Sequence, residues 1–202
     1  MIIYMSDILC VTNRKLCNGD FLERIEAIAK AGPAGILLRE KDLPETEYKA
    51  LAKKVMEICR DYQTLCILHS FVDVAIELNS PSIHIPLPLL RKMTVDQKAK
   101  FSHIGASCHS VEEAKEAEAL GCTYLIAGHI FATDCKKGIP PRGTKFLREV
   151  CELVNIPVYA IGGISKENIM AVRDTGAKGA CIMSGLMQCV KPEEYLKQLN
   201  MK

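Results

Sequence analysis

Short apolar runs alternate along this chain with longer segments in which apolar residues return every three or four positions. The short runs have the length and composition of buried strands, and the longer segments have helical periodicity. The runs that predict strands cover residues 8–12, 35–39, 64–69, 82–85, 104–107, 124–128, 158–161 and 179–183. The segments that predict helices cover residues 20–31, 44–62, 72–78, 94–101, 110–120, 144–154, 165–175 and 192–199.

Turn and capping residues mark several of these boundaries. Gly32-Pro33 ends the first predicted helix, and Pro44 opens the second. Ser110 followed three residues later by Glu113 fits a capping box at the start of the helix over 110–120. The helix over 94–101 has the weakest pattern of all.

Eight strand–helix units of about 25 residues each fill the chain, which is close to the compact limit of a (β/α)8 barrel. A doubly wound open sheet has the same alternation of strands and helices, but the count of eight favours the barrel. We therefore expect one TIM-barrel domain over residues 1–202. Barrels of this size often associate through their outer helices, so a homo-oligomer is possible.

Composition and charge narrow the classes of function. A hydrophobic fraction of 49% against 25% charged residues is ordinary for a globular chain, and a net charge of +2 does not favour nucleic acid as a partner. We find no secretory signal pattern and no apolar run long enough to span a bilayer. The ten cysteines form no CxxC pair, and several lie in apolar runs, which favours reduced thiols in the cytoplasm.

The residues at the ends of the predicted strands suit an anionic ligand. In a barrel these ends form the active-site face. Arg39, Lys41 and Lys136 would converge there and bind a carboxylate or phosphate, although each could also be a solvated surface charge. Ser107 and Thr133 add hydroxyl groups at the same face. Acidic residues are scarce there, and Glu40 and Asp134 do not make a plausible metal site, so we expect no metal.

Glycines follow the last two predicted strands. Gly162 and Gly163 come after the seventh strand, and Ser184 and Gly185 after the eighth. Backbone N–H groups in such loops can close on a phosphate, and these two loops are the usual phosphate site of TIM barrels. Tight turns alone would also explain the glycines, but two such loops at the expected places favour a phosphate site.

His129 is the candidate proton carrier, because it follows Gly128 at a strand end beside a cationic loop. A buried structural histidine is the alternative. His69 and His109 also lie at strand ends, where either could order a loop. His84 lies within a predicted strand and His103 precedes one, so we interpret both as structural.

Several motifs resemble the thiamine phosphate synthase/TenI superfamily of (β/α)8 barrels over nearly the whole chain. The segment 128–138 with Arg142-Gly143, followed by residues 183–185, is the most specific combination and resembles the TenI branch, the thiazole tautomerases. The other matching stretches are residues 38–41, 107–110, 112–114 and 160–164.

The synthase branch joins a pyrimidine diphosphate to a thiazole phosphate and uses Mg²⁺ to neutralise the departing pyrophosphate. The resemblance implies an Asn-Asp pair after the third strand and a further Asp after the fourth, but this chain has His69-Ser70 and Pro86-Leu87-Pro88 there. It also has Leu37 in place of the synthase's Gln, and His129 where the synthase usually has Pro. These differences speak against synthase activity.

The resemblance therefore implies a thiazole tautomerase, an isomerase that aromatises a thiazole carboxylate phosphate without a cofactor. It implies that His129 is the acid/base and that Gly162, Gly163, Ser184 and Gly185 hold the phosphate. Thr133 and Lys136, with Arg39 or Lys41, would face the carboxylate. The alternatives are thiamine phosphate synthase, or a protein that binds a thiamine-pathway phosphate without turnover.

Overall fold

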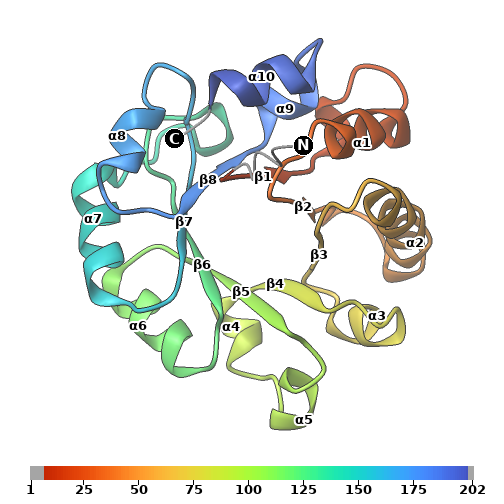
Figure 1. Cartoon of the computed structure of the whole chain (residues 1–202). Helices are drawn as coiled ribbons and strands as arrows, with labels where there is room; N and C mark the ends of the chain where they lie inside the picture. Colours follow the sequence, from red (N-terminus) through yellow and green to blue (C-terminus); the bar gives the residue numbers. More distant parts are fainter. Residues whose placement is uncertain (1–6, 200–202) are drawn as a thin grey trace.

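Eight parallel strands close into a barrel in the computed structural model, which describes residues 7–199 (Figure 1). Neighbouring strands pair in chain order, and β8 returns to pair with β1, so the predicted barrel is confirmed and the open sheet is not. The strands are β1 (Ile8–Val11), β2 (Gly35–Leu38), β3 (Cys66–His69), β4 (Ser82–Pro86), β5 (His103–Cys108), β6 (Tyr124–Gly128), β7 (Val158–Ile161) and β8 (Gly179–Ile182).

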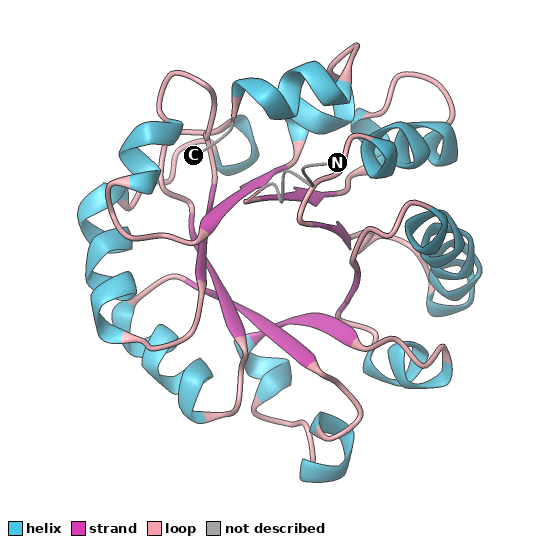
Figure 2. Cartoon of the chain, in the orientation of Figure 1, coloured by secondary structure: helices cyan, strands magenta, loops and turns pink. Residues whose placement is uncertain are grey.

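The helices form a ring around the outside of the barrel (Figure 2). They are α1 (Phe21–Lys30), α2 (Glu45–Asp61), α3 (Val72–Glu77), α4 (Leu87–Leu90), α5 (Val95–Lys98), α6 (Val111–Ala119), α7 (Gly143–Leu153), α8 (Ile169–Arg173), α9 (Ser184–Gln188) and α10 (Pro192–Gln198). Two 3₁₀ turns, η1 (Arg14–Leu16) and η2 (Asp134–Lys136), lie in the loops after β1 and β6.

Four helices differ from the sequence prediction. The helix expected over 94–101 is only the single turn α5, and α4 was not predicted because its four residues, Leu-Pro-Leu-Leu, show no helical period. The helix expected over 165–175 is α8 alone, since Asn168 Oδ1 accepts a hydrogen bond from Ser165 N at 2.9 Å and holds the preceding residues in a turn. Short helix α9 lies within the segment that we interpreted as a loop.

Ser110 caps α6 as predicted, accepting a hydrogen bond from Glu113 N at 3.2 Å. The reciprocal bond differs from a capping box, because the Glu113 carboxylate accepts from His109 N at 2.6 Å. The cap therefore also fixes the first residue of the loop after β5.

Alternating strand residues divide the core into two layers. One set packs between the barrel and the helices, and includes Ile83, Ile85 and the buried Cys10. The other set fills the barrel interior, and includes Leu37, Tyr124 and Ile126. This alternation follows from the period of two along each strand, and it decides which side chains reach the inside of the barrel.

The cysteines whose side chains are described are free thiols. Burial raises the pKa of the Cys10 and Cys181 thiols, as expected of cysteines that pack as small apolar residues. Within residues 7–199, no helix is both long and apolar enough to cross a membrane. A cytoplasmic location stays a prediction.

Candidate functional site

Because every strand pair is parallel, the carboxyl ends of all eight strands lie at one end of the barrel, which we call the mouth. The predicted site residues follow or end β2, β5, β6, β7 and β8, so the fold gathers them there. The mouth has two halves, one at the ends of β2–β5 and the other at the ends of β6–β8.

Polar side chains fill the barrel interior on the β2–β5 side. The rings of His69 and His84 lie almost parallel, with centroids 6.1 Å apart. His84 Nε2 lies 2.9 Å from Ser107 Oγ, and its Nδ1 lies 3.2 Å from the Tyr124 hydroxyl. His69 Nδ1 is hydrogen-bonded to Ser70 Oγ. A polar chain thus connects β3, β4, β5 and β6 across the inside of the barrel.

The imidazoles of His69 and His84 are both uncharged at neutral pH. Burial, with further contributions from His84 and the charges of Lys41 and Arg39, lowers the pKa of His69 to about 2. Burial, and then the charges of Arg39 and Lys41, lowers the pKa of His84 to about 3. A neutral imidazole carries one N–H donor and one acceptor nitrogen, so each ring can both donate and accept a hydrogen bond.

The predicted cations do converge at the mouth. Lys41 is exposed, yet the hydration that its ammonium loses, together with the positive charges of Arg39 and Lys136, lowers its pKa. Lys136 comes from the loop after β6, which therefore reaches across toward the end of β2. This concentration of like charge favours an anion at the mouth.

A buried carboxylate anchors the loops after β1 and β2. Glu40 Oε1 accepts hydrogen bonds from Thr12 Oγ1 at 2.7 Å and Arg14 N at 3.0 Å. Its Oε2 accepts from Arg14 N at 3.2 Å and from the Arg14 guanidinium at 3.1 Å. Thr12 Oγ1 in turn accepts from Arg39 N at 3.0 Å, which fixes the backbone of this cationic residue.

On the β6–β8 side the backbone dominates. His129 is buried, and its Nε2 lies 3.2 Å from the Ile139 carbonyl oxygen. Gly162 (φ +101°) lies so close to His129 that a Cβ atom would come within 2.3 Å of the His129 Cβ. A Cβ atom on Gly163 would lie 2.3 Å from the Ala132 carbonyl oxygen. The loops after β6 and β7 therefore pack against each other only because both positions are glycine.

The loop after β8 is covered from the outside by α10. Gly185 lies beneath Tyr195, because a Cβ atom there would come within 1.9 Å of the Tyr195 hydroxyl. Ser184 is exposed at the first turn of α9. Ser184 and Gly185 thus share the mouth with the β7 loop, as predicted, while their contact with phosphate stays a prediction.

The side chains of several other predicted strand-end residues take no part in the contacts described above. Thr133 is partly buried in the loop after β6, and Asp134 pairs with Lys137 at 3.4 Å on the surface. His109 is exposed, with its Nδ1 3.4 Å from the Glu113 carboxylate. His103 begins β5 and so lies at the opposite end of the barrel.

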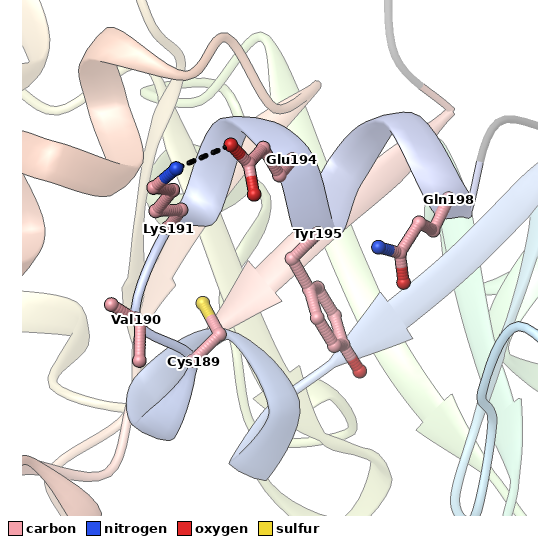
Figure 3. Close-up of a pocket in the computed structure, with 6 residues that line it drawn as sticks. All are labelled: Cys189, Val190, Lys191, Glu194, Tyr195 and Gln198. Carbon is pink, nitrogen blue, oxygen red and sulfur yellow. Dashed lines mark hydrogen bonds and ion pairs between the residues drawn. The ribbon is translucent and has the colours of Figure 1, made fainter.

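Among the described residues, two of the surface hollows flank the barrel. A hollow of about 260 Å³ lies beside the β3 loop, and the residues that line it include Ser70, Phe71, Asp73, Lys92 and Gln97. The other, of about 300 Å³, lies between α9 and α10 and is lined by residues such as Cys189 and Tyr195 (Figure 3). None of the predicted site residues lines this second hollow.

A closed (β/α)8 barrel with cations and glycine loops at its carboxyl end is typical of enzymes that act on phosphorylated small molecules. A family model described as thiamine monophosphate synthase matches residues 8–186, and the chain belongs to this family.

Relatives named as synthases extend over almost the whole chain. A thiamine-phosphate synthase of Fusobacterium nucleatum is 34% identical, covering 96% of this chain and 97% of its own length. A putative thiamine-phosphate synthase 2 of Aquifex aeolicus is 36% identical over 88% of this chain and 96% of its own. The structure of thiamine phosphate pyrophosphorylase from Pyrococcus furiosus superposes with a TM-score of 0.81 at 30% identity, covering 95% and 92% of the two chains.

These relatives overturn the expected function. The interpretation as a thiazole tautomerase, an isomerase, is wrong, because the relatives carry the name thiamine-phosphate synthase. The motif around His129 lies in one loop, whereas the similarity to the synthases extends over nearly the whole chain. The superfamily itself was predicted correctly.

The residues at the mouth do not fit the Mg²⁺ that the synthase resemblance implies. Mg²⁺ prefers oxygen ligands, above all carboxylates. The expected carboxylate positions hold His69, Ser70 and Pro86, and both carboxylate oxygens of Glu40 already accept hydrogen bonds from Thr12 and Arg14. Among the described residues, no cluster of three or more His, Cys, Asp or Glu side chains could hold a metal ion.

Sequence reasoning missed some residues that shape the mouth. His84 was interpreted as structural, yet the structure places it in the barrel interior beside Ser107. The alternation of Ile83, His84 and Ile85 was the available signal, because apolar neighbours that face the helices put the histidine on the opposite face. Tyr48 of α2, which bonds to the ends of β2 and β3, gave no signal, since its partners are backbone atoms of other segments.

Proposed function

We propose that this chain is a transferase that joins a pyrimidine diphosphate to a thiazole phosphate and releases pyrophosphate. The observation that carries the proposal is the similarity to thiamine-phosphate synthases, which covers 96% of this chain in the Fusobacterium nucleatum relative. The geometry of the mouth supports it, because two anionic substrates need two separate anion sites and the mouth has cations in one half and glycine loops in the other.

In this proposal the diphosphate binds at the ends of β2–β5, which Lys136 also reaches from the loop after β6; we call this the cationic half. Negative charge develops on the leaving pyrophosphate as its bond to the pyrimidine breaks and the bond to the thiazole forms. Arg39, Lys41 and Lys136 would offset this charge, since Arg39 and Lys136 both contribute, after desolvation, to the lowered pKa of Lys41. The buried Glu40 keeps the Arg39 backbone in place through Thr12.

The half at the ends of β6–β8, which we call the glycine half, takes the thiazole phosphate. Backbone N–H groups of Gly162, Gly163, Ser184 and Gly185 would bind its phosphate oxygens. His129 has its Nε2 near the Ile139 carbonyl and packs against Gly162, which suits a residue that positions the substrate. Ser107 and Thr133 would add hydroxyl contacts.

Formation of thiamine phosphate from the two substrates, followed by mass spectrometry, tests this proposal. The assay includes Mg²⁺, as the synthase branch requires, and compares the wild type with Arg39→Met and Arg60→Met. We expect turnover by the wild type and by Arg60→Met, whose exposed side chain lies on α2, and about a hundredfold loss for Arg39→Met. Absence of product with the wild type would contradict the proposal.

A second candidate is a protein that binds the phosphorylated thiazole without turnover. The absence of the expected carboxylates after β3 and β4 favours it. Binding of the thiazole phosphate without any product in the same assay would identify this function instead.

A further inference from the structure

At the ends of β3 and β4 this chain lacks the residues that the resemblance to the synthase branch implies. The inference drawn from this difference rests on the proposed function. His69 and Ser70 follow or end β3, and Pro86 ends β4, at the places where the synthase branch has its Asn-Asp pair and further Asp. These positions lie within the cationic half of the mouth, where the diphosphate would bind.

His69 and Ser70 are held in place by hydrogen bonds to α2 and β4 and to each other. His69 N donates to the Tyr48 hydroxyl at 2.8 Å, and Ser70 N donates to the His84 carbonyl at 3.1 Å. Ser70 Oγ occupies Nδ1 of His69, so Nε2 is the nitrogen that can meet a ligand. The His69 imidazole therefore lies in a fixed position at the mouth. Because the ring is uncharged, it is a hydrogen-bond partner for an oxygen atom rather than a ligand for Mg²⁺.

The surrounding charges oppose a divalent cation. Arg39 and Lys41 both act on His69 and His84, and Lys136 acts on Lys41. The carboxylates next to these residues in the chain are already paired. Glu40 and Asp42 bind Arg14, and Asp134 binds Lys137.

We propose that this mouth binds the diphosphate directly through Arg39, Lys41 and Lys136, with His69 and Ser70 as hydrogen-bond partners, and without a divalent metal. The positive charges that replace the metal belong to the chain itself. An anion bound in this way gains charge-assisted hydrogen bonds that do not depend on metal concentration.

Calorimetric titration with inorganic pyrophosphate tests the inference without any need for turnover. The purified chain is titrated once with EDTA and once with Mg²⁺ in excess. We expect dissociation constants that agree within about twofold in the two titrations, or weaker binding with Mg²⁺, since Mg²⁺ competes for free pyrophosphate. A tenfold or larger gain in affinity with Mg²⁺, or no binding with EDTA, would overturn the inference.

A paired substitution tests whether His69 and Ser70 are responsible. His69→Asn combined with Ser70→Asp restores the residue types of the synthase branch. We expect this variant to bind pyrophosphate about tenfold more weakly in EDTA, because a carboxylate repels the anion, and to recover affinity when Mg²⁺ is added. An identical response to Mg²⁺ in the variant and the wild type would overturn the assignment to these two residues.

The chain offers a matched control for this variant. Ser102 and His103 are another adjacent pair of the same residue types, exposed at the opposite end of the barrel. Ser102→Asp combined with His103→Asn makes the same chemical change and should bind pyrophosphate as the wild type does. The inference and the proposed function fail separately, because metal-free binding without thiamine phosphate formation would contradict only the latter.

Discussion

The two halves of the mouth would offer different groups to the anions that we propose they bind. The half at the ends of β2–β5 presents side chains, with the charges of Arg39 and Lys41 beside the neutral imidazoles of His69 and His84. The half at the ends of β6–β8 presents backbone atoms, because Gly162, Gly163 and Gly185 let neighbouring segments approach closely.

The difference shows two ways to build an anion site. Charge carried by side chains can be altered at one residue while the backbone stays in place. A backbone cradle depends instead on the absence of Cβ atoms, so a single methyl group can displace two loops at once. Substitutions in the glycine half should therefore affect stability most, and substitutions in the cationic half should affect mainly binding.

Gly162→Ala should have the largest effect. The added Cβ would lie 2.3 Å from the His129 Cβ at a residue with φ +101°. Strain in the backbone and the overlap with His129 together should lower the free energy of unfolding by about 3 kcal/mol, as measured by urea denaturation.

Gly121→Ala is the control for this prediction. Gly121 has a similar φ of +93°, but nothing lies within 4 Å of an added Cβ. Only the backbone cost of about 1 kcal/mol should remain. Equal losses in the two variants would show that the close approach between the loops contributes nothing.

Tyr48→Phe should destabilise the ends of β2 and β3, which carry the cationic half. The buried Tyr48 hydroxyl donates to the Leu38 carbonyl at 2.8 Å and accepts from His69 N at 2.8 Å, and so joins the ends of β2 and β3. Loss of both bonds should lower the free energy of unfolding by about 2 kcal/mol. Tyr62→Phe removes a surface hydrogen bond to Glu26 and should cost less than about 0.5 kcal/mol. Similar losses in both variants would contradict this role of Tyr48.

Acid should destabilise the cationic half through its neutral imidazoles. In the unfolded chain His69 and His84 take up protons near the ordinary value of 6.5, while burial lowers their folded pKa values to about 2 and about 3. The unfolded state then binds more protons, so the stabilisation is complete above that ordinary value and is lost as the pH falls below it. Between about pH 7 and about pH 5 each imidazole should cost about 2 kcal/mol of unfolding free energy.

His84→Gln sharpens this test, because it removes one of the two buried imidazoles. Urea denaturation at a series of pH values should show a shallower acid dependence in this variant than in the wild type. His109→Gln, at an exposed position beside Glu113, should keep the wild-type dependence. Parallel pH curves for the wild type and His84→Gln would contradict the burial of a neutral His84.

Lys41→Met should have the smallest effect on the free energy and should change binding rather than stability. Removal of one of the converging charges should weaken binding of inorganic pyrophosphate about tenfold and reduce its salt dependence. Lys53→Met, on the exposed face of α2, should bind as the wild type does. An equal effect of both substitutions would mean that net charge alone attracts the anion.

Much of the fold could be predicted because it follows from local patterns. The eight strands were predicted from apolar runs, and β6 and β7 were predicted with their observed bounds, since buried parallel strands between turn residues have a strong local signal. The short helices α4 and α9 escaped prediction because one turn of helix shows no period.

The candidate site residues could be predicted because the ends of the strands could be located in the sequence. Arg39, Lys41 and His129 lie at the mouth as expected, because parallel strands bring their carboxyl ends together. The branch of the family was assigned wrongly, since it was judged from one loop rather than from the whole chain.

The order of apolar and polar residues was therefore sufficient for the barrel and for the end at which chemistry can occur. Only the tertiary structure decided the rest. It shows that Gly162 packs against His129, that Tyr48 bonds to the ends of two strands, and that burial neutralises His69 and His84. The physical reason is range. Periodicity acts within one segment, whereas desolvation, charge and close contact depend on what other segments bring to the same place.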